Sequence, residues 1–196
     1  MCVLYPYYAT QAEKAKGKIT IGTGHVITGK EDPKILAAIK KLEKEGKITC
    51  MWVKNKAGQY IKNPTHARDV ISQSYADKLF KNDLKIAQDR VKQSLDMCNN
   101  MDDNVKYYVL YNKDIFDAMT SLCFNAGTLK PSKYRYMQSL EKCRFDTENN
   151  TINASDWAVT APKFKIHYSN KALTDRRVEE FNLFGLADAN QTFAMN

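Results

Sequence analysis

A long stripe of apolar residues in the middle of the chain is the feature that most constrains the fold. The stripe recurs at the three- and four-residue spacing of one helix face, with Ser72 in front of it as a suitable N-cap. Its members are Ala76, Leu79, Phe80, Leu84, Ala87, Val91 and Leu95. A helix of more than about six turns is long for a globular domain. We therefore expect residues 72–98 to form a helix that connects two lobes.

The segments on either side of this stripe have different characters. Before it, β-branched runs and glycine turns predict short strands and turns over 1–30, a helix over 33–45 and a hairpin over 47–62. After it, apolar spacing predicts helices over 113–126, 131–143 and 171–184, and an Asn- and Thr-rich loop over 146–156. The expected fold is α+β and mostly helical. It has a small β-containing N-terminal lobe (1–71), the connecting helix (72–98) and a helical C-terminal lobe (99–196).

The charge of the chain favours a polyanionic partner. Thirty Lys and Arg residues oppose 22 Asp and Glu residues, a net charge of +8. Nucleic acid, an anionic membrane and the bacterial cell wall all fit that charge. No zinc motif, basic helix or ribonucleoprotein-type aromatic motif supports nucleic-acid binding, so we expect none. No apolar run approaches the ~18 residues of a membrane span, and residues 1–8 do not resemble a signal peptide.

The cysteines and histidines point to neither a disulfide framework nor a metal site. The five cysteines are odd in number, and no two have CxxC spacing, so we expect free thiols made in a reducing cytosol. Cys123 lies in an apolar run and is expected in the core. His25 has no second His or Cys at ligand spacing. We therefore expect no metal and no cofactor.

Four ordered stretches carry a resemblance to a known family. They are Thr20-Ile21-Gly22-Thr23-Gly24-His25, residues 71–83 with Leu79-Phe80 and Asp83, residues 116–127 with Asn125, and residues 173–180 with Arg176-Arg177. In this order and with this spacing they resemble the phage-type lysozymes, glycoside hydrolase family 24. The resemblance implies a two-lobed lysozyme-like fold. It also implies an endolysin or virion lysozyme that cleaves the β-1,4 glycan link of peptidoglycan.

The family's catalytic groups are only partly found in this sequence. Such enzymes need an acid for the leaving oxygen and a second group that stabilises the transition state or activates water. The resemblance assigns the water-holding role to Thr20, places the family's Asp at Ala9, and places its Glu before Met1. Glu13 is a candidate substitute for the Asp, or else a solvated residue beside neighbouring lysines. Either the protein extends upstream of Met1 or the chain is a non-catalytic homologue, and an upstream extension would not account for Ala9.

The resemblance assigns supporting roles to further residues. It implies that His25 pairs with Asp83 and so pins the small lobe to the connecting helix. It places Arg176, Arg177 and Asn125 at the substrate, although the two arginines also fit a basic helix face covering Trp157 or another aromatic ring. The implied partner is the glycan strand, reached by a monomer or a component of a phage particle. Synthesis in the host bacterial cytoplasm and action at the wall or in the virion are expected. The alternative is an inactive lysozyme-like binding or structural module of the virion.

Overall fold

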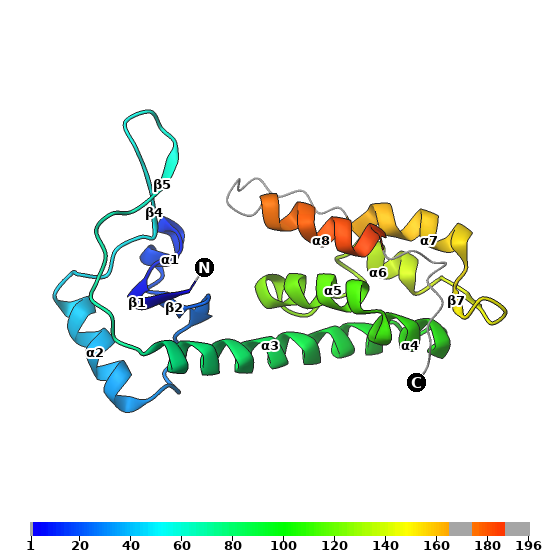
Figure 1. Ribbon diagram of the computed structural model, residues 1–196, viewed down its shortest axis with the longest axis horizontal. Helices are drawn as coiled ribbons and strands as arrows, with labels where there is room; N and C mark the ends of the chain where they lie inside the picture. The colour runs from blue at the N-terminus through cyan, green and yellow to red at the C-terminus, as the bar shows by residue number, and fades with distance from the viewer. Residues whose placement is uncertain (1, 165–173, 187–196) are drawn as a thin grey trace. The chain divides into compact units, whose positions relative to one another are not determined.

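The computed structural model describes residues 2–164 and 174–186, and the chain divides into two compact units. The first unit comprises residues 1–83 and the second residues 84–196. The boundary falls inside helix α3 (Gln73–Asp96), which is the long helix predicted from the apolar stripe (Figure 1). Both units therefore share one uninterrupted backbone element. The expected α+β, mostly helical architecture is confirmed.

A three-stranded antiparallel sheet begins the first unit. Its strands are β1 (Val3–Tyr7), β2 (Thr20–Gly22) and β3 (His25–Val26), in the order β1-β2-β3. The prediction of strands and turns alone was incomplete here, because the short helix α1 (Gln11–Ala15) lies between β1 and β2. The hydroxyl of Thr10 caps α1 by accepting a hydrogen bond from the Glu13 backbone N–H at 3.1 Å. No residue of α1 is buried, so no apolar spacing marks it in the sequence.

Gly22 takes a backbone conformation that favours glycine, at a point where β2 packs against helix α3. Its φ of 64° lies in the left-handed region, where a side chain is strained. A Cβ on Gly22 would lie 3.7 Å from the Cβ of Ala76, a buried residue of α3. The glycine turn predicted from the sequence thus bends the backbone between β2 and β3 and brings the sheet against the helix.

The rest of the first unit is helix α2 (Pro33–Lys44) and a separate hairpin of β4 (Trp52–Lys54) and β5 (Tyr60–Lys62). The predicted helix over 33–45 is confirmed. The hairpin predicted over 47–62 is shorter, because its first strand begins only at Trp52. The preceding segment instead follows the end of β1, where the Tyr8 N–H donates to the carbonyl of Thr49 at 3.0 Å.

The second unit, over its described residues 84–164 and 174–186, is mostly helical and includes one short hairpin. Its helices are α4 (Asp103–Tyr111), α5 (Lys113–Ala126), α6 (Arg135–Leu140), α7 (Ala154–Thr160), the 3-10 helix η1 (Ala161–Phe164) and α8 (Thr174–Leu186). Strands β6 (Phe145–Asp146) and β7 (Thr151–Ile152) pair antiparallel. Helix α5 is central, with Ile115, Met119 and Leu122 fully buried, and α8 packs against it.

Several boundaries in the second unit differ from the predictions. Helix α4 was not predicted, and the predicted loop over 146–156 contains β7 and the start of α7. The helix predicted over 131–143 is shorter, because residues 131–133 form a turn before α6. Of the helix predicted over 171–184, residues 171–173, including Leu173 of the family motif, lie outside the described residues.

The cysteines are free thiols, as the sequence predicted. All five cysteines are free, and all except Cys2 are buried. Burial raises the pKa of the Cys98 thiol to about 11 and that of Cys123 to about 12. Within residues 2–164 and 174–186, no helix combines the length and the apolar character that crossing a bilayer requires.

Replacing Asn112 with Ala should destabilise the second unit by about 1–3 kcal/mol. Asn112 ends α4 and begins α5, is 3% exposed, and accepts a hydrogen bond from the Ile115 N–H at 3.1 Å. Its removal leaves that buried donor without a partner. Urea unfolding should detect the loss. Asp102→Ala, which removes the exposed cap of α4, is the matched control and should cost less because water can replace the cap. Equal losses for the two variants would contradict this account.

Candidate functional site

Thr20 and Glu13 both border Tyr7 in the first unit. Thr20 lies in β2, is 4% exposed, and pairs across the sheet with Tyr7 of β1. Glu13 lies in the first turn of α1. Burial, followed by the charge of Glu13, raises the pKa of Tyr7 to about 12, which indicates that the Glu13 carboxylate lies near the Tyr7 hydroxyl. The structure thus brings the two predicted catalytic residues to the same strand neighbour.

The Glu13 carboxylate is held at one oxygen only. Its Oε1 accepts a hydrogen bond from Lys18 Nζ at 3.0 Å, whereas its Oε2 is buried and has no hydrogen-bond partner. The sequence offered Glu13 as a solvated residue beside Lys14 and Lys16, and the structure pairs its partly exposed side chain with Lys18.

Ala9, which the resemblance aligns with the family's Asp, carries only a methyl group. Ala9 is partly buried and packs against the core of the first unit between β1 and α1. It can neither accept a proton nor carry a negative charge. Met1, next to which the resemblance places the family's Glu, lies outside the described residues.

His25 bonds to Asp83, as the resemblance implied, and also to a residue that the sequence analysis missed. His25 Nδ1 lies 2.8 Å from Asp83 Oδ2, and His25 Nε2 lies 3.1 Å from Glu31 Oε1. The contacts join strand β3 to helix α3 and to the loop before α2. Both ring nitrogens face carboxylate oxygens, so a doubly protonated ring satisfies both contacts, whereas a neutral ring leaves one without a proton.

Glu31 is the centre of a dense hydrogen-bond network. It accepts hydrogen bonds from the Thr28 N–H, the Thr28 hydroxyl and the Gly29 N–H, each at 2.8 Å, besides its contact with His25. Burial alone would raise the pKa of Glu31, but the hydrogen bonds from Thr28 and His25 lower it to about 2. No sequence signal marked Glu31. Its partners reach it because the chain folds into a tight turn, and no residue spacing typical of a motif reveals that turn.

In the second unit, the three residues that the resemblance assigned to substrate lie around Ser121 and Glu180. Arg176 Nε donates to Ser121 Oγ at 3.1 Å, and Asn125 Nδ2 donates to the Ser121 carbonyl at 3.0 Å. The Ser121 hydroxyl in turn donates to Glu180 Oε1 at 2.5 Å. Arg177 forms an ion pair with the other oxygen of Glu180. Helices α5 and α8 thus meet through a polar cluster.

Burial divides the cluster into an inner pair and an outer pair. Arg177 and Glu180 are 6% and 3% exposed, and burial raises the pKa of Glu180 despite Ser121 and the two arginines. Within this inner pair, Glu180 joins α8 to α5 by accepting the hydrogen bond from Ser121. Arg176 and Asn125 are more exposed, and the Arg176 guanidinium lies 5.8 Å from the centre of the Phe124 ring. Arg176 therefore covers an aromatic ring, although the ring is not that of Trp157.

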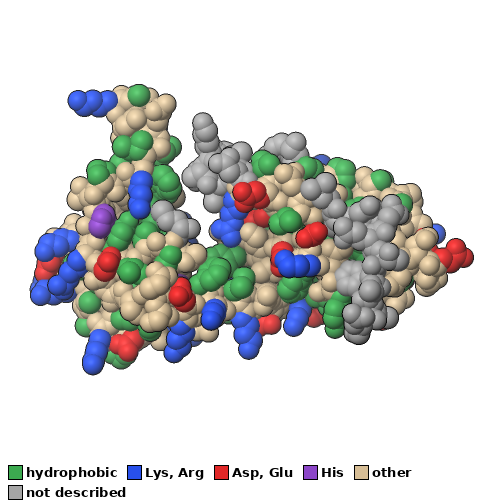
Figure 2. Space-filling model, viewed as in Figure 1, with side chains coloured by type: hydrophobic (Ala, Val, Ile, Leu, Met, Phe, Trp, Pro, Cys, Tyr) green, Lys and Arg blue, Asp and Glu red, His purple; other side chains and the backbone are tan. Residues whose placement is uncertain are grey.

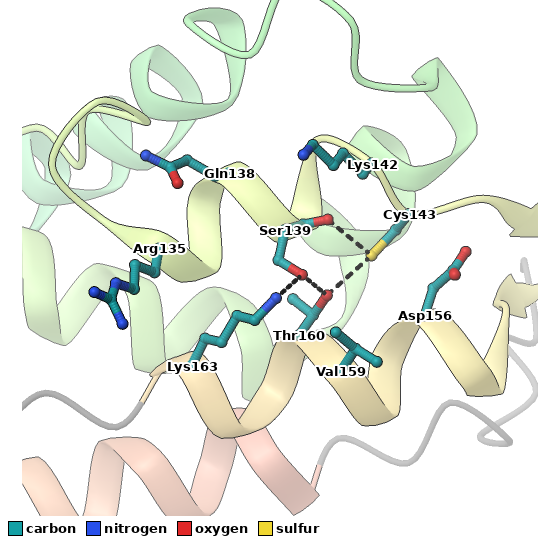
Figure 3. Close-up of a pocket in the computed structure, with 9 residues that line it drawn as sticks. All are labelled: Arg135, Gln138, Ser139, Lys142, Cys143, Asp156, Val159, Thr160 and Lys163. Carbon is teal, nitrogen blue, oxygen red and sulfur yellow. Dashed lines mark hydrogen bonds between the residues drawn. The ribbon is translucent and has the colours of Figure 1, made fainter.

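A pocket of about 350 Å³ lies between α6, α7 and η1. Figure 3 shows Lys163 pointing to Ser139, and Ser139 and Thr160 pointing to one another, with Nζ–Oγ and Oγ–Oγ1 distances of 3.0 and 2.8 Å. The Cys143 thiol lies 3.3 Å from Thr160 Oγ1, and burial raises its pKa. A protonated thiol is a poor nucleophile. These contacts link three helical segments and form no catalytic set. Nor does any cluster of His, Cys, Asp and Glu in the described part of the chain suit a metal ion.

Comparison with known proteins identifies one family. The family model described as phage lysozyme matches residues 6–180, which include strands β2 and β3, all of α3 and the α5–α8 cluster. Neither the curated proteins nor the solved structures gave a significant match.

Replacing Glu31 with Gln should remove a stabilisation that is present at neutral pH and lost in acid. The pKa of Glu31 is lowered to about 2 in the folded protein, so its contribution is complete above the unfolded value near 4.5. That contribution is lost as pH falls from about 4.5 to about 2. The free energy of unfolding should drop by up to about 3 kcal/mol at pH 7, and the difference from wild type should vanish near pH 2. Urea unfolding across this range measures it. Glu148→Gln is an exposed control, and a pH-independent loss for Glu31→Gln would refute the charge argument.

Replacing Asp83 with Asn should destabilise the first unit by about 1–3 kcal/mol, because a charged acceptor of the His25 ring is lost. A double-mutant cycle with His25→Gln should give a coupling energy above about 0.5 kcal/mol. Asp89→Asn, an exposed change on the same helix, is the control. Additive effects in the cycle would mean that the His25–Asp83 contact contributes nothing of its own.

Proposed function

Because this chain belongs to the phage lysozyme family, we propose that it hydrolyses the peptidoglycan glycan strand at the β-1,4 muramyl–glucosaminyl link. The observation that supports this activity is the extent of the family match, which includes Thr20, the His25–Asp83 pair and the Arg176–Arg177 pair. The net charge of +8 favours approach to an anionic wall. The protein would act at the wall or within the virion, as a monomer or as a component of the phage particle.

In the proposed reaction, Thr20 positions the water that attacks the sugar. Its hydroxyl would accept or donate one hydrogen bond to that water, and the surrounding sheet fixes its direction. Glu13, which the sequence offers as a substitute for the family's Asp and whose Oε1 accepts a hydrogen bond from Lys18, is the candidate carboxylate that receives the water's proton. The proposal assigns no residue of this sequence to the general acid that protonates the leaving oxygen.

His25, Asp83 and Glu31 act as positioning residues in this proposal. They attach β3 to α3, and β3 pairs with the strand that carries Thr20. A fixed strand keeps the Thr20 hydroxyl in one place, which matters because small displacements of a reacting group are costly. Arg176 and Asn125 are the proposed contacts to substrate, since they are the outer members of their cluster.

A second candidate function is a lysozyme-like module without catalysis. It is supported by Ala9, which packs on the core of the first unit and which the resemblance aligns with the family's Asp. Such a module would bind the glycan strand, or serve as a structural part of the virion, without cleaving it. The two functions differ in one product, the new reducing end that hydrolysis of the glycan releases.

Replacing Thr20 with Val tests the catalytic proposal. The change keeps the shape and removes the hydroxyl, so hydrolysis of purified peptidoglycan should fall by about 10²-fold or more. Release of reducing ends measures the rate, and circular dichroism checks the fold. Thr151→Val is the matched control, because Thr151 is 2% exposed in the second unit and its hydroxyl has no hydrogen-bond partner.

The wild-type chain decides between the two functions in the same assay. Release of reducing ends that requires Thr20 supports the muramidase. Wall binding without any release supports the inactive module and overturns the catalytic proposal. Release that is unchanged in Thr20→Val would leave glycan hydrolysis standing but remove Thr20 from it.

A further inference from the structure

The β4–β5 hairpin presents aromatic and basic side chains on one face. Its register pairs Trp52 with Lys62 and Lys54 with Tyr60. Cross-strand partners lie on the same face of a sheet, and so do residues two apart along a strand. These four residues, called here the hairpin face, therefore lie together. Val53 and Ile61 lie on the opposite face.

Folding does not account for the apolar residues of this hairpin. Tyr60 is 66% exposed, Ile61 41% and Trp52 38%, and no residue of β5 is buried. Figure 2 shows apolar side chains along the projecting hairpin, with basic side chains beside them. Exposed aromatic residues of this size contribute little to stability and commonly mark a binding surface.

The hairpin is held in shape at both ends. At its tip, Asn55 Oδ1 accepts hydrogen bonds from the N–H groups of Ala57 and Gln59, at 3.0 and 2.9 Å. At its root, the Asn63 N–H donates to the Met51 carbonyl at 2.7 Å, and Met51 is buried in the core. On the hairpin face itself, Lys54 Nζ lies 5.4 Å from the centre of the Tyr60 ring. A preformed surface loses less conformational entropy when it binds a ligand.

The charge around the hairpin selects an anionic ligand. Residues 46–68 contain five Lys and Arg residues and no Asp or Glu. The first unit as a whole has 15 basic and 8 acidic residues, a net charge of +7, whereas the second has 15 and 14. Nearly all of the protein's excess positive charge thus lies in the unit that carries the hairpin. A polyanion would be attracted to this unit and not to the other.

We propose that the hairpin face is an accessory binding site for the anionic glycan strand of the cell wall, separate from Thr20. The apolar C–H faces of sugar rings would stack on Trp52 and Tyr60, which removes apolar surface from water. Lys54 and Lys62 would pair with carboxylates on the peptides that the glycan carries. The identity of the ligand rests on the proposed function, but binding at this face does not require the chain to be catalytic.

The test is binding to purified peptidoglycan sacculi stripped of attached polymers, measured by co-sedimentation. Trp52→Ala with Tyr60→Ala should weaken binding by about tenfold or more. Lys54→Gln with Lys62→Gln should weaken it severalfold and reduce its dependence on salt.

Two pairs of substitutions serve as controls. Tyr107→Ala with Tyr111→Ala removes two aromatics that are 49% and 56% exposed in the second unit. Lys40→Gln with Lys44→Gln removes two exposed charges from α2. Both control pairs should bind within about twofold of wild type.

A fluorescence measurement reports on the hairpin directly. Trp52 is exposed and Trp157 is buried. Solubilised glycan should therefore blue-shift the emission and protect it from acrylamide, and Trp52→Phe should abolish both changes. Hydrolysis of short soluble glycan fragments should be unaffected by the hairpin changes. Absence of hydrolysis would overturn only the catalytic proposal. The accessory site would still be tested, because binding to sacculi is measured separately.

Three results would overturn the accessory site. The first is unchanged binding to sacculi when Trp52 and Tyr60 are both replaced. The second is binding to single-stranded DNA that is tighter than binding to sacculi and is lost in the same variants. The third is the same pattern with vesicles of anionic lipid in place of DNA. If the aromatic variant loses binding and its circular dichroism spectrum is also disturbed, the variant with Lys54→Gln and Lys62→Gln decides the matter. That variant changes only exposed side chains.

Discussion

The hydrogen bond between His25 and Asp83 couples the sheet of the first unit to the helix that continues into the second. Asp83 is the last residue of the first unit, and α3 runs on through residue 96. His25 stands at the start of β3, next to the strand that carries Thr20. The position of Thr20 relative to α3 therefore depends on this contact and on the packing of Gly22 against Ala76. Glu31 fixes the opposite side of the His25 ring, so the ring is restrained from both sides.

Much of the fold was predictable because it is encoded locally. The apolar stripe identified α3, and Gly127 marked the end of α5, where its φ is 77°. Pro33 marked the start of α2. These signals act within a few residues, so the sequence displays them directly. By contrast, α1 has no buried residue, and its one signal was the Thr10–Glu13 capping pattern. The β6–β7 hairpin was missed because its Asn- and Thr-rich sequence is typical of a loop, although Ile152 is fully buried.

The candidate site was less predictable than the fold, for reasons of distance along the chain. The pairing of His25 with Asp83 spans 58 residues and came from the family resemblance, not from any local pattern. The Ser121–Glu180 hydrogen bond, which spans 59 residues and joins α5 to α8, was predicted neither by a local pattern nor by the resemblance. Glu31 has its partners nearby, yet only the fold of the Thr28–Gly29 turn reveals that its carboxylate is enclosed. Sequence patterns identified the elements, whereas the electrostatic environment of each carboxylate required coordinates.

The arrangement of the thiols has a consequence for chemical durability. Four of the five cysteines are enclosed in the two cores, and burial holds the thiols of Cys98 and Cys123 in their protonated form. A chain built this way keeps the same covalent framework when its surroundings change from reducing to oxidising. The exposed thiol of Cys2 is the one open to an oxidant. Mild oxidation would therefore join two molecules through Cys2 and leave both interiors intact.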